Sequence, residues 1–241
     1  MSSKKLCYLC GTKVADTKDH LFPSGLFNRP LPNNLPQRLP ACGECNNALS
    51  SDEEQFRVFL ASGMAFETKA GFRVWTERIR PDLKGARPRL KPLIQSQIKL
   101  ARVLSESGAL LGHTLIQEMD RETVNRVLRK IARGLYFLDT GNILPDNVQI
   151  LADYGANRPE RFISPPLDEA IKGARRTDLG DGVVTYWRNI MKDDPTASIT
   201  WLKFYEDKLF MICTYREDNL AQGNEGDLKS LLYLPLQNGE G

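Results

Sequence analysis

The stretch CGECNNALS, residues 42–50, carries the second of two Cys-x-x-Cys pairs in this chain of 241 residues. The first pair lies in CYLCG, residues 7–11. Each pair places two thiolates on one tight turn, and zinc prefers a tetrahedron of such soft ligands. The first residues of the chain lack the apolar run of a secretion signal, so two such pairs predict a metal site before disulfides. We therefore expect a structural zinc ion bound by Cys7, Cys10, Cys42 and Cys45.

The sequence around these pairs, residues 1–55, is rich in Cys, Asn, Pro and Gly and lacks a long periodic apolar run. Such a segment suits a small module that a metal ion holds together. A closed site of four thiolates has no open position for a substrate, so any reaction needs other residues. Between the two pairs lies TKDHLFPSG, residues 17–25, with one of the two histidines, and Asn46 directly follows the second pair.

The combination of CYLCG, DHLFP and CGECNNALS resembles the HNH endonuclease superfamily, the ββα-metal nucleases, and most of all its members with a pair of Cys₄ zinc knuckles. The resemblance covers residues 7–54. It implies that Asp19 and Asn46 hold a catalytic Mg²⁺ or Mn²⁺ ion and that His20 is the general base. The name of the superfamily leads one to expect a histidine where this chain has Asn46, and this departure leaves only two protein ligands for the cation.

The residue types agree with these roles on chemical grounds. A hard cation such as Mg²⁺ prefers oxygen ligands, and a neutral imidazole can take a proton from water. Successive side chains of a strand point to opposite faces, so either the backbone at Asp19 and His20 is irregular, or His20 reaches the phosphate from the other side of the cation. The alternatives are that Asp19 accepts structural hydrogen bonds, that His20 is a structural residue, and that Asn46 is a helix N-cap.

The whole chain predicts an α+β protein in three parts: a treble-clef or ββα-metal zinc module over 1–60, a helical and basic region over 61–145, and an antiparallel β-rich region of unknown role over 146–241. The clearest helix is expected over 120–141, with Asp120 as its N-cap and Gly141 at its end. A second helix is expected over 90–108. In the last part, SITWLKFY and KLFMICTY predict a β-hairpin around Glu206 and Asp207.

Basic residues are concentrated between Lys69 and Arg102, where ten Lys or Arg and two acidic residues give a net charge of +8 in a chain whose total is +3. Such a band can bind a nucleic-acid backbone without reading its sequence, and the alternative is a solvated helix face. The candidate nucleic-acid-binding residues are Arg73, Arg78, Arg80, Lys84, Arg87, Arg89 and Lys91.

These features predict a metal-dependent endonuclease that hydrolyses phosphodiester bonds in DNA, with a protein partner or a homodimer as a further option. One alternative is a non-catalytic zinc-finger module that binds nucleic acid or protein. The other is an RNA-cleaving enzyme that uses the same site. The chain has no apolar run of about 18 residues, so we expect no membrane span, and a cytoplasmic location is the default.

Overall fold

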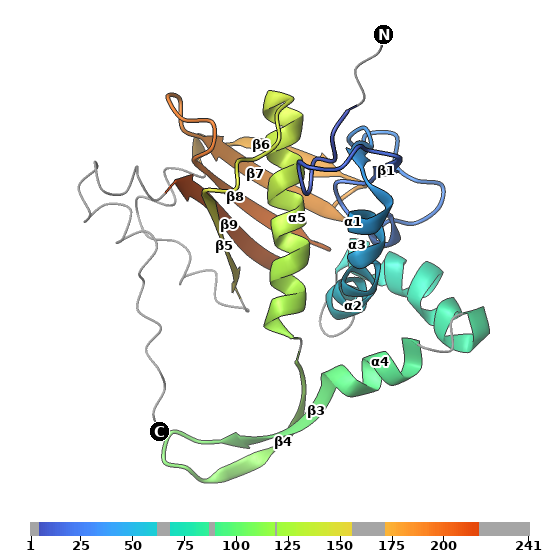
Figure 1. The fold of residues 1–241 in the computed structure, drawn as a ribbon. Helices are drawn as coiled ribbons and strands as arrows, with labels where there is room; N and C mark the ends of the chain where they lie inside the picture. Colours follow the sequence, from blue (N-terminus) through green and yellow to red (C-terminus); the bar gives the residue numbers. More distant parts are fainter. Residues whose placement is uncertain (1–4, 62–67, 87–89, 119, 156–171, 217–241) are drawn as a thin grey trace.

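A computed structural model of the chain describes residues 5–61, 68–86, 90–118, 120–155 and 172–216. A run of helical segments precedes a run of antiparallel strands along these residues, so the predicted α+β class is confirmed. Figure 1 shows a long helix lying across one face of an antiparallel sheet, with the N-terminal segments beside that helix. Within the described ranges, no helix is both long and apolar enough to cross a bilayer.

The N-terminal part is built from short elements around the two cysteine pairs. A bridge between Leu6 and Val14 closes the first knuckle, and Gly11 inside it has a φ of 67°, which glycine adopts without steric cost. Strand β1 (Thr17–Asp19) then pairs antiparallel with β2 (Leu39–Ala41), and helix α1 (Gly43–Ala48) follows directly. Two short strands and a helix thus lie in sequence after the first knuckle.

The middle of the chain continues in short helical segments. A 3-10 turn, η1 (Ser24–Leu26), lies in the loop between β1 and β2. The segments that follow α1 are α2 (Ser50–Ala61), α3 (Lys69–Val74), the π-helical turns η3 (Trp75–Ile79) and η4 (Asp82–Ala86), and α4 (Leu90–Gln97).

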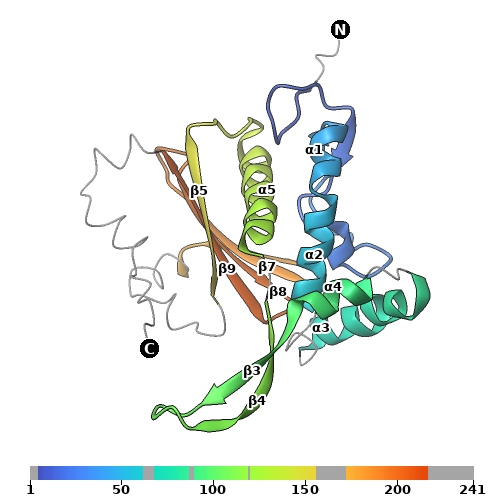
Figure 2. The same cartoon turned by 60° about the horizontal axis from the view of Figure 1, so that its bottom comes forward.

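The helix predicted over 90–108 is only half right. Helix α4 ends at Gln97, and the chain continues as β3 (Ile98–Leu104), which pairs antiparallel with β4 (Leu110–Gln117). This two-stranded ribbon projects from the body of the protein (Figure 2), and its Leu100 and Leu115 side chains are each 69% exposed. Pairing with a strand further along the chain, which the local pattern does not reveal, overrides the helical preference here.

Helix α5 (Arg121–Thr140) matches the prediction at both ends. The carboxylate of Asp120 accepts hydrogen bonds from the backbone N–H of Glu122 and Thr123, and Gly141 ends the helix with a φ of 72°. Gly134 lets α5 approach the N-terminal part closely, because a Cβ there would lie 2.5 Å from the Leu21 side chain. One apolar stripe of α5 belongs to the core, because the side chains of Val127, Leu128, Ile131 and Leu135 are buried.

The five-stranded sheet has the order β5-β9-β8-β7-β6 with every neighbouring pair antiparallel. The predicted hairpin is confirmed as β8 and β9, with positive φ values at Tyr205 and Glu206 in its turn. Phe204 and Phe210 pack against Phe56 of α2 with ring centroids 5.4 and 5.6 Å away. One core thereby joins this sheet to the N-terminal part. The strands are β5 (Val148–Gly155), β6 (Arg175–Leu179), β7 (Val184–Ile190), β8 (Ser198–Phe204) and β9 (Lys208–Arg216).

Candidate metal centre and the Asp19 site

The four cysteines of the two Cys-x-x-Cys pairs come together, as predicted. Their Sγ atoms all lie within 4.8 Å of one another, with Cys7 and Cys42 buried and Cys10 and Cys45 half-buried. Tetrahedral zinc at about 2.3 Å from each sulfur separates the sulfur atoms by about 3.8 Å, so the cluster suits this ion. The four residues therefore form a possible structural zinc site.

Asp19, at the end of β1, is buried and fully engaged. It is 5% exposed, and its carboxylate accepts hydrogen bonds from the Tyr8 hydroxyl at 2.8 Å and from the Lys130 ammonium at 2.9 Å. The same ammonium contacts the carboxylate of Glu53 on α2. We call Tyr8, Asp19, Glu53 and Lys130 the Lys130 cluster. It links β1, α2 and α5, and the predicted cation ligand Asp19 is held directly by two groups, Tyr8 and Lys130.

The electrostatics of the Lys130 cluster favour these hydrogen bonds. Burial, reinforced by the neighbouring Asp19 carboxylate, raises the pKa of Tyr8, so its hydroxyl stays protonated and donates. Burial also raises the pKa of Glu53, and the attraction of Lys130 opposes that shift. One buried ammonium thus faces the buried carboxylate of Asp19 and the half-buried carboxyl group of Glu53, and it is the main source of compensation for their loss of water.

His20 directly follows β1 and is half-buried. Burial lowers its pKa, and the positive charge of Arg38 lowers it further, whereas Asp19 acts in the opposite direction. The imidazole is therefore neutral at pH 7, which is the form that can accept a proton from water.

Asn46 lies in the first turns of α1, close to the strand that carries Asp19. Its amide Nδ2 is 3.5 Å from the Thr17 hydroxyl oxygen, and Thr17 shares a face of β1 with Asp19 because they are two residues apart. The N-cap of α1 is Cys42, so the alternative that Asn46 caps this helix is wrong. Asn46 and Asp19 thus stand on neighbouring elements of one small frame.

The donor types at this site suit a divalent cation, but their present arrangement does not. A carboxylate and an amide oxygen are ligands that Mg²⁺ accepts. The carboxylate of Asp19, however, is already bonded to Lys130 and Tyr8, and the side chain of Asn46 is turned to Thr17. A cation at Asp19 has to displace the ammonium of Lys130.

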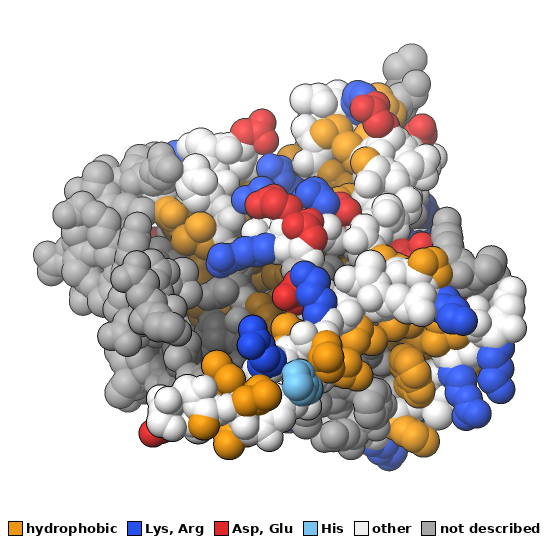
Figure 3. Space-filling view, turned by 90° about the horizontal axis from the view of Figure 1, so that it is seen from below, with side chains coloured by type: hydrophobic (Ala, Val, Ile, Leu, Met, Phe, Trp, Pro, Cys, Tyr) orange, Lys and Arg blue, Asp and Glu red, His pale blue; other side chains and the backbone are white. Residues whose placement is uncertain are grey.

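The predicted basic band follows the short helical segments from α3 to α4. Figure 3 shows Lys and Arg side chains along the right-hand edge of the face seen from below. Arg78 on η3 is half-buried and lines a pocket, and Arg73 on α3 lies 3.9 Å from Asp181. Arg80, Lys84 and Lys91 are exposed, whereas Arg87 and Arg89 lie outside the described residues.

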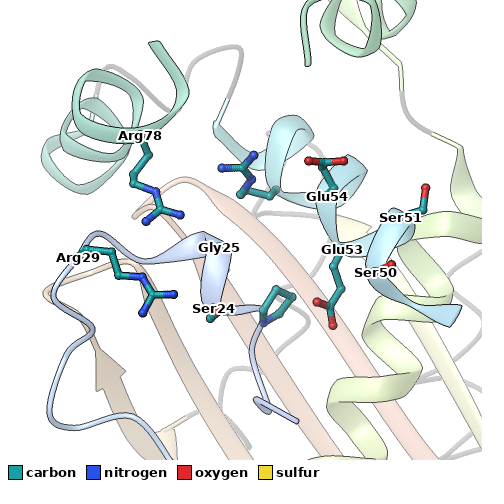
Figure 4. A pocket seen from close by; sticks show the side chains of 10 residues that line it. Ser24, Gly25, Arg29, Ser50, Ser51, Glu53, Glu54 and Arg78 are labelled. Atoms are coloured by element: carbon teal, nitrogen blue, oxygen red, sulfur yellow. The ribbon is translucent and has the colours of Figure 1, made fainter. Parts of the chain in front are cut away.

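The sequence did not reveal that pocket, which has a volume of about 360 Å³ and lies between η1, α2 and η3. Figure 4 shows Arg29 and Arg78 pointing toward one another on one side of it, with Glu53 and Glu54 coming from α2 on the other. Arg57, on α2, also lines it. Arg29 and Arg57 fall outside the basic band, so charge density could not single them out.

Lys130 was also missed, although the sequence carried a signal for it. It lies three residues after Val127 and directly before Ile131, on the buried stripe of α5. A charged residue on such a stripe requires a buried partner of opposite charge.

No protein-family model, curated protein or solved structure matches this chain. The resemblance to HNH endonucleases thus depends on the motifs within residues 7–54 alone. What can be argued about function has to come from the residues and their geometry.

Proposed function

We propose that this chain is a zinc-stabilised endonuclease of the HNH type that hydrolyses phosphodiester bonds in DNA. The observation that carries the proposal is the order of elements after the first cysteine knuckle: β1, β2 and α1, with the second cysteine pair at the start of the helix. This frame supports the proposed site because Asp19 ends β1, His20 follows it, and the side chain of Asn46 reaches β1 from α1.

In this proposal each residue has one task. His20 accepts a proton from the water that attacks phosphorus, while the bond from phosphorus to the leaving oxygen breaks and that oxygen takes a proton from solvent. Asp19 and Asn46 would hold a divalent cation if Lys130 released the carboxylate. The cation, when bound, supplies positive charge at the scissile phosphate and at the leaving oxygen.

The test is cleavage of plasmid DNA by the zinc-loaded protein with Mg²⁺ or Mn²⁺. The only other histidine, His113, is exposed on the β3–β4 ribbon and provides a matched control. We expect His20→Ala to lower the cutting rate at least 100-fold, the lower bound for loss of a general base, and His113→Ala to leave it unchanged. Equal rates for both variants, with zinc retained, would contradict the proposal. RNA of the same sequence, tested alongside, separates the RNA-cleaving alternative.

One observation favours a second function, a non-catalytic zinc module that binds nucleic acid or protein. The ammonium of Lys130 already neutralises Asp19 from within the chain, as a structural partner would. In that case the protein binds nucleic acid without cutting it, and His20→Ala binds as tightly as the wild type. The cleavage assay, combined with a binding measurement, separates the two functions.

A further inference from the structure

The pocket between η1, α2 and η3 is lined by a buried arginine, Arg57, whose hydrogen bonds are incomplete. The side chain of Arg57 is 3% exposed, and its Nη1 lies 3.3 Å from the Asp82 carboxylate. Its Nη2 has no hydrogen-bond partner within the described part of the chain. A buried guanidinium with an unused donor carries a cost, and a ligand bearing negative charge would remove that cost once a small shift of the pocket wall uncovers Nη2.

Arg57 is held where it lines the pocket. Gly25, in η1, packs directly against its side chain, because a Cβ at residue 25 would lie 3.0 Å from the Arg57 Cδ. The buried Tyr205 hydroxyl donates a hydrogen bond to the Leu26 carbonyl at 3.0 Å. Burial raises the pKa of Tyr205, and the positive charges of Arg57 and Arg78 oppose that rise. The charges of Arg57 and Arg78 therefore both act on the Tyr205 hydroxyl beneath η1.

Two further arginines complete one side of the pocket. Figure 4 shows Arg29, from the loop after η1, and Arg78, from η3, directing their guanidinium groups toward one another beside Ser24 and Gly25. A guanidinium group presents donors in a planar fork that matches the oxygen atoms of a phosphate. Arg29, Arg57 and Arg78, from three separate segments, thus line one pocket that has room for a ligand.

The opposite wall has acidic and hydroxyl groups. Glu53 and Glu54 line it together with the first two serines of α2, Ser50 and Ser51. The carboxylate of Glu53 is engaged by Lys130. A simple anion would meet the acids of this wall, whereas a phosphorylated compound with hydroxyl or amino groups can satisfy both sides. The volume of about 360 Å³ lies within the range of about 300–1,000 Å³ typical of small-molecule sites.

We propose that this pocket binds the phosphate of a nucleotide, with Arg29, Arg57 and Arg78 as its ligands. The phosphate accepts hydrogen bonds on the arginine side, and the sugar or base donates to the α2 side. Glu53 joins the pocket to the Lys130 cluster, so the nucleotide lies next to the Asp19 site. The assignment of this nucleotide to a DNA strand rests on the proposed function, whereas phosphate binding itself does not.

The experiment measures binding of a labelled single-stranded oligodeoxynucleotide to the zinc-loaded full chain without added divalent cation. Unlabelled thymidine 5′-monophosphate and thymidine serve as competitors. The variant Arg29→Gln/Arg78→Gln removes two exposed or half-buried arginines of the pocket, and Arg129→Gln/Arg175→Gln removes the same charge at exposed positions outside it. In a second variant, Gly25→Ala, the added methyl group displaces Arg57 and leaves every charge in place.

We expect the monophosphate to compete and thymidine not to compete. The pocket variant should bind the oligonucleotide at least about tenfold more weakly, with a shallower salt dependence, whereas the control stays within about twofold. Gly25→Ala should also weaken binding. Equal affinities of the pocket and control variants for both the oligonucleotide and the monophosphate, or equal competition by the monophosphate and thymidine, would overturn the proposal.

The two possible sources of the phosphate give different results. Loss of both oligonucleotide and monophosphate binding in the pocket variant supports a nucleotide within a strand. Loss of monophosphate binding alone identifies a free nucleotide and overturns the assignment to a strand. Binding is measured without divalent cation, so it is tested separately from cleavage. Nucleotide binding through this pocket in a protein that never cuts DNA would support the pocket proposal and contradict only the proposed nuclease activity.

Discussion

Lys130 and Arg57 are two buried cations, each 2% exposed, that differ in how well they are paired. The ammonium of Lys130 contacts the carboxylates of Asp19 and Glu53 inside the Lys130 cluster. Arg57 has one contact of 3.3 Å with Asp82 and an Nη2 atom without a partner in the described residues. The two cations are therefore equally buried, but the charge of Lys130 is well paired and that of Arg57 is only partly paired.

The degree of pairing separates a buried charge that stabilises the fold from a buried charge that can bind a ligand. A buried ion that is well paired by its own chain has little to gain from a ligand, so a competing cation at Asp19 must first displace Lys130. A buried ion with an unused donor gains from a ligand of opposite charge. Glu53 belongs to both surroundings, because it contacts Lys130 and also lines the pocket of Arg57.

Zinc removal should produce the largest effect, because both cations depend on residues between the two cysteine pairs. Asp19 pairs with Lys130 from this segment, and Gly25 packs on Arg57. We expect a zinc chelator, or Cys42→Ser, to unfold the N-terminal part and to abolish oligonucleotide binding, since folding of small zinc modules is coupled to metal binding. Circular dichroism and bound-zinc analysis provide the readout. Retention of full binding after zinc loss would disprove this dependence.

Lys130→Met should be the most damaging single change at either cation. It leaves the buried carboxylate of Asp19 without a counter-charge and removes the partner of the half-buried Glu53, so we expect a loss of about 3–5 kcal/mol in the free energy of unfolding, mainly from Asp19. Urea denaturation of the zinc-loaded protein measures it.

The matched control is Lys18→Met, at an exposed lysine of β1, which should change stability by less than about 0.5 kcal/mol. Replacing Asp19 and Glu53 by Asn and Gln together with Lys130→Met should recover part of the loss. If Lys130→Met is as stable as the control, the cluster does not hold the three elements together.

Arg57→Met should lower the free energy of unfolding less than Lys130→Met does, and it should lower oligonucleotide affinity more. Its partner Asp82 has a side chain that is 17% exposed and can regain water, so we expect a loss of about 1–3 kcal/mol. Oligonucleotide affinity should fall in the folded variant, whereas Lys130→Met should retain it where it remains folded. Both are measured on the same zinc-loaded samples. The reverse ranking in both measurements would remove the distinction between the two cations.

The elements that local pattern determines were predictable, and those that depend on distant contacts were not. Asp120 and Gly141 mark the ends of α5 because capping is a property of a few neighbouring residues. The β3 strand was mistaken for helix because its pairing with β4 is not encoded within residues 90–108. Cysteine spacing likewise predicted the cluster of four cysteines, since two identical ligand pairs are rare by chance.

The candidate site was predictable only in its motif residues. Asp19, His20 and Asn46 were chosen from their positions between and after the cysteine pairs. The residue that engages Asp19, however, lies 111 positions further along the chain, and no local pattern connects Lys130 to it. The pocket arginines come from three separate elements, so only the folded chain brings Arg29, Arg57 and Arg78 together.

In the proposed nuclease, Asp19 exchanges its contact with Lys130 for a divalent cation when DNA is bound. Binding of Mn²⁺ tests this exchange. Electron paramagnetic resonance would count Mn²⁺ bound to zinc-loaded His20→Ala protein, which should not cut, in the presence of an oligonucleotide duplex. We expect one bound Mn²⁺ per chain, and we expect Asp19→Asn to lose it. The control Asp146→Asn, which replaces a side chain that is 92% exposed, should retain it. Equal Mn²⁺ binding by the Asp19 and Asp146 variants, or none by the parent protein, would contradict it.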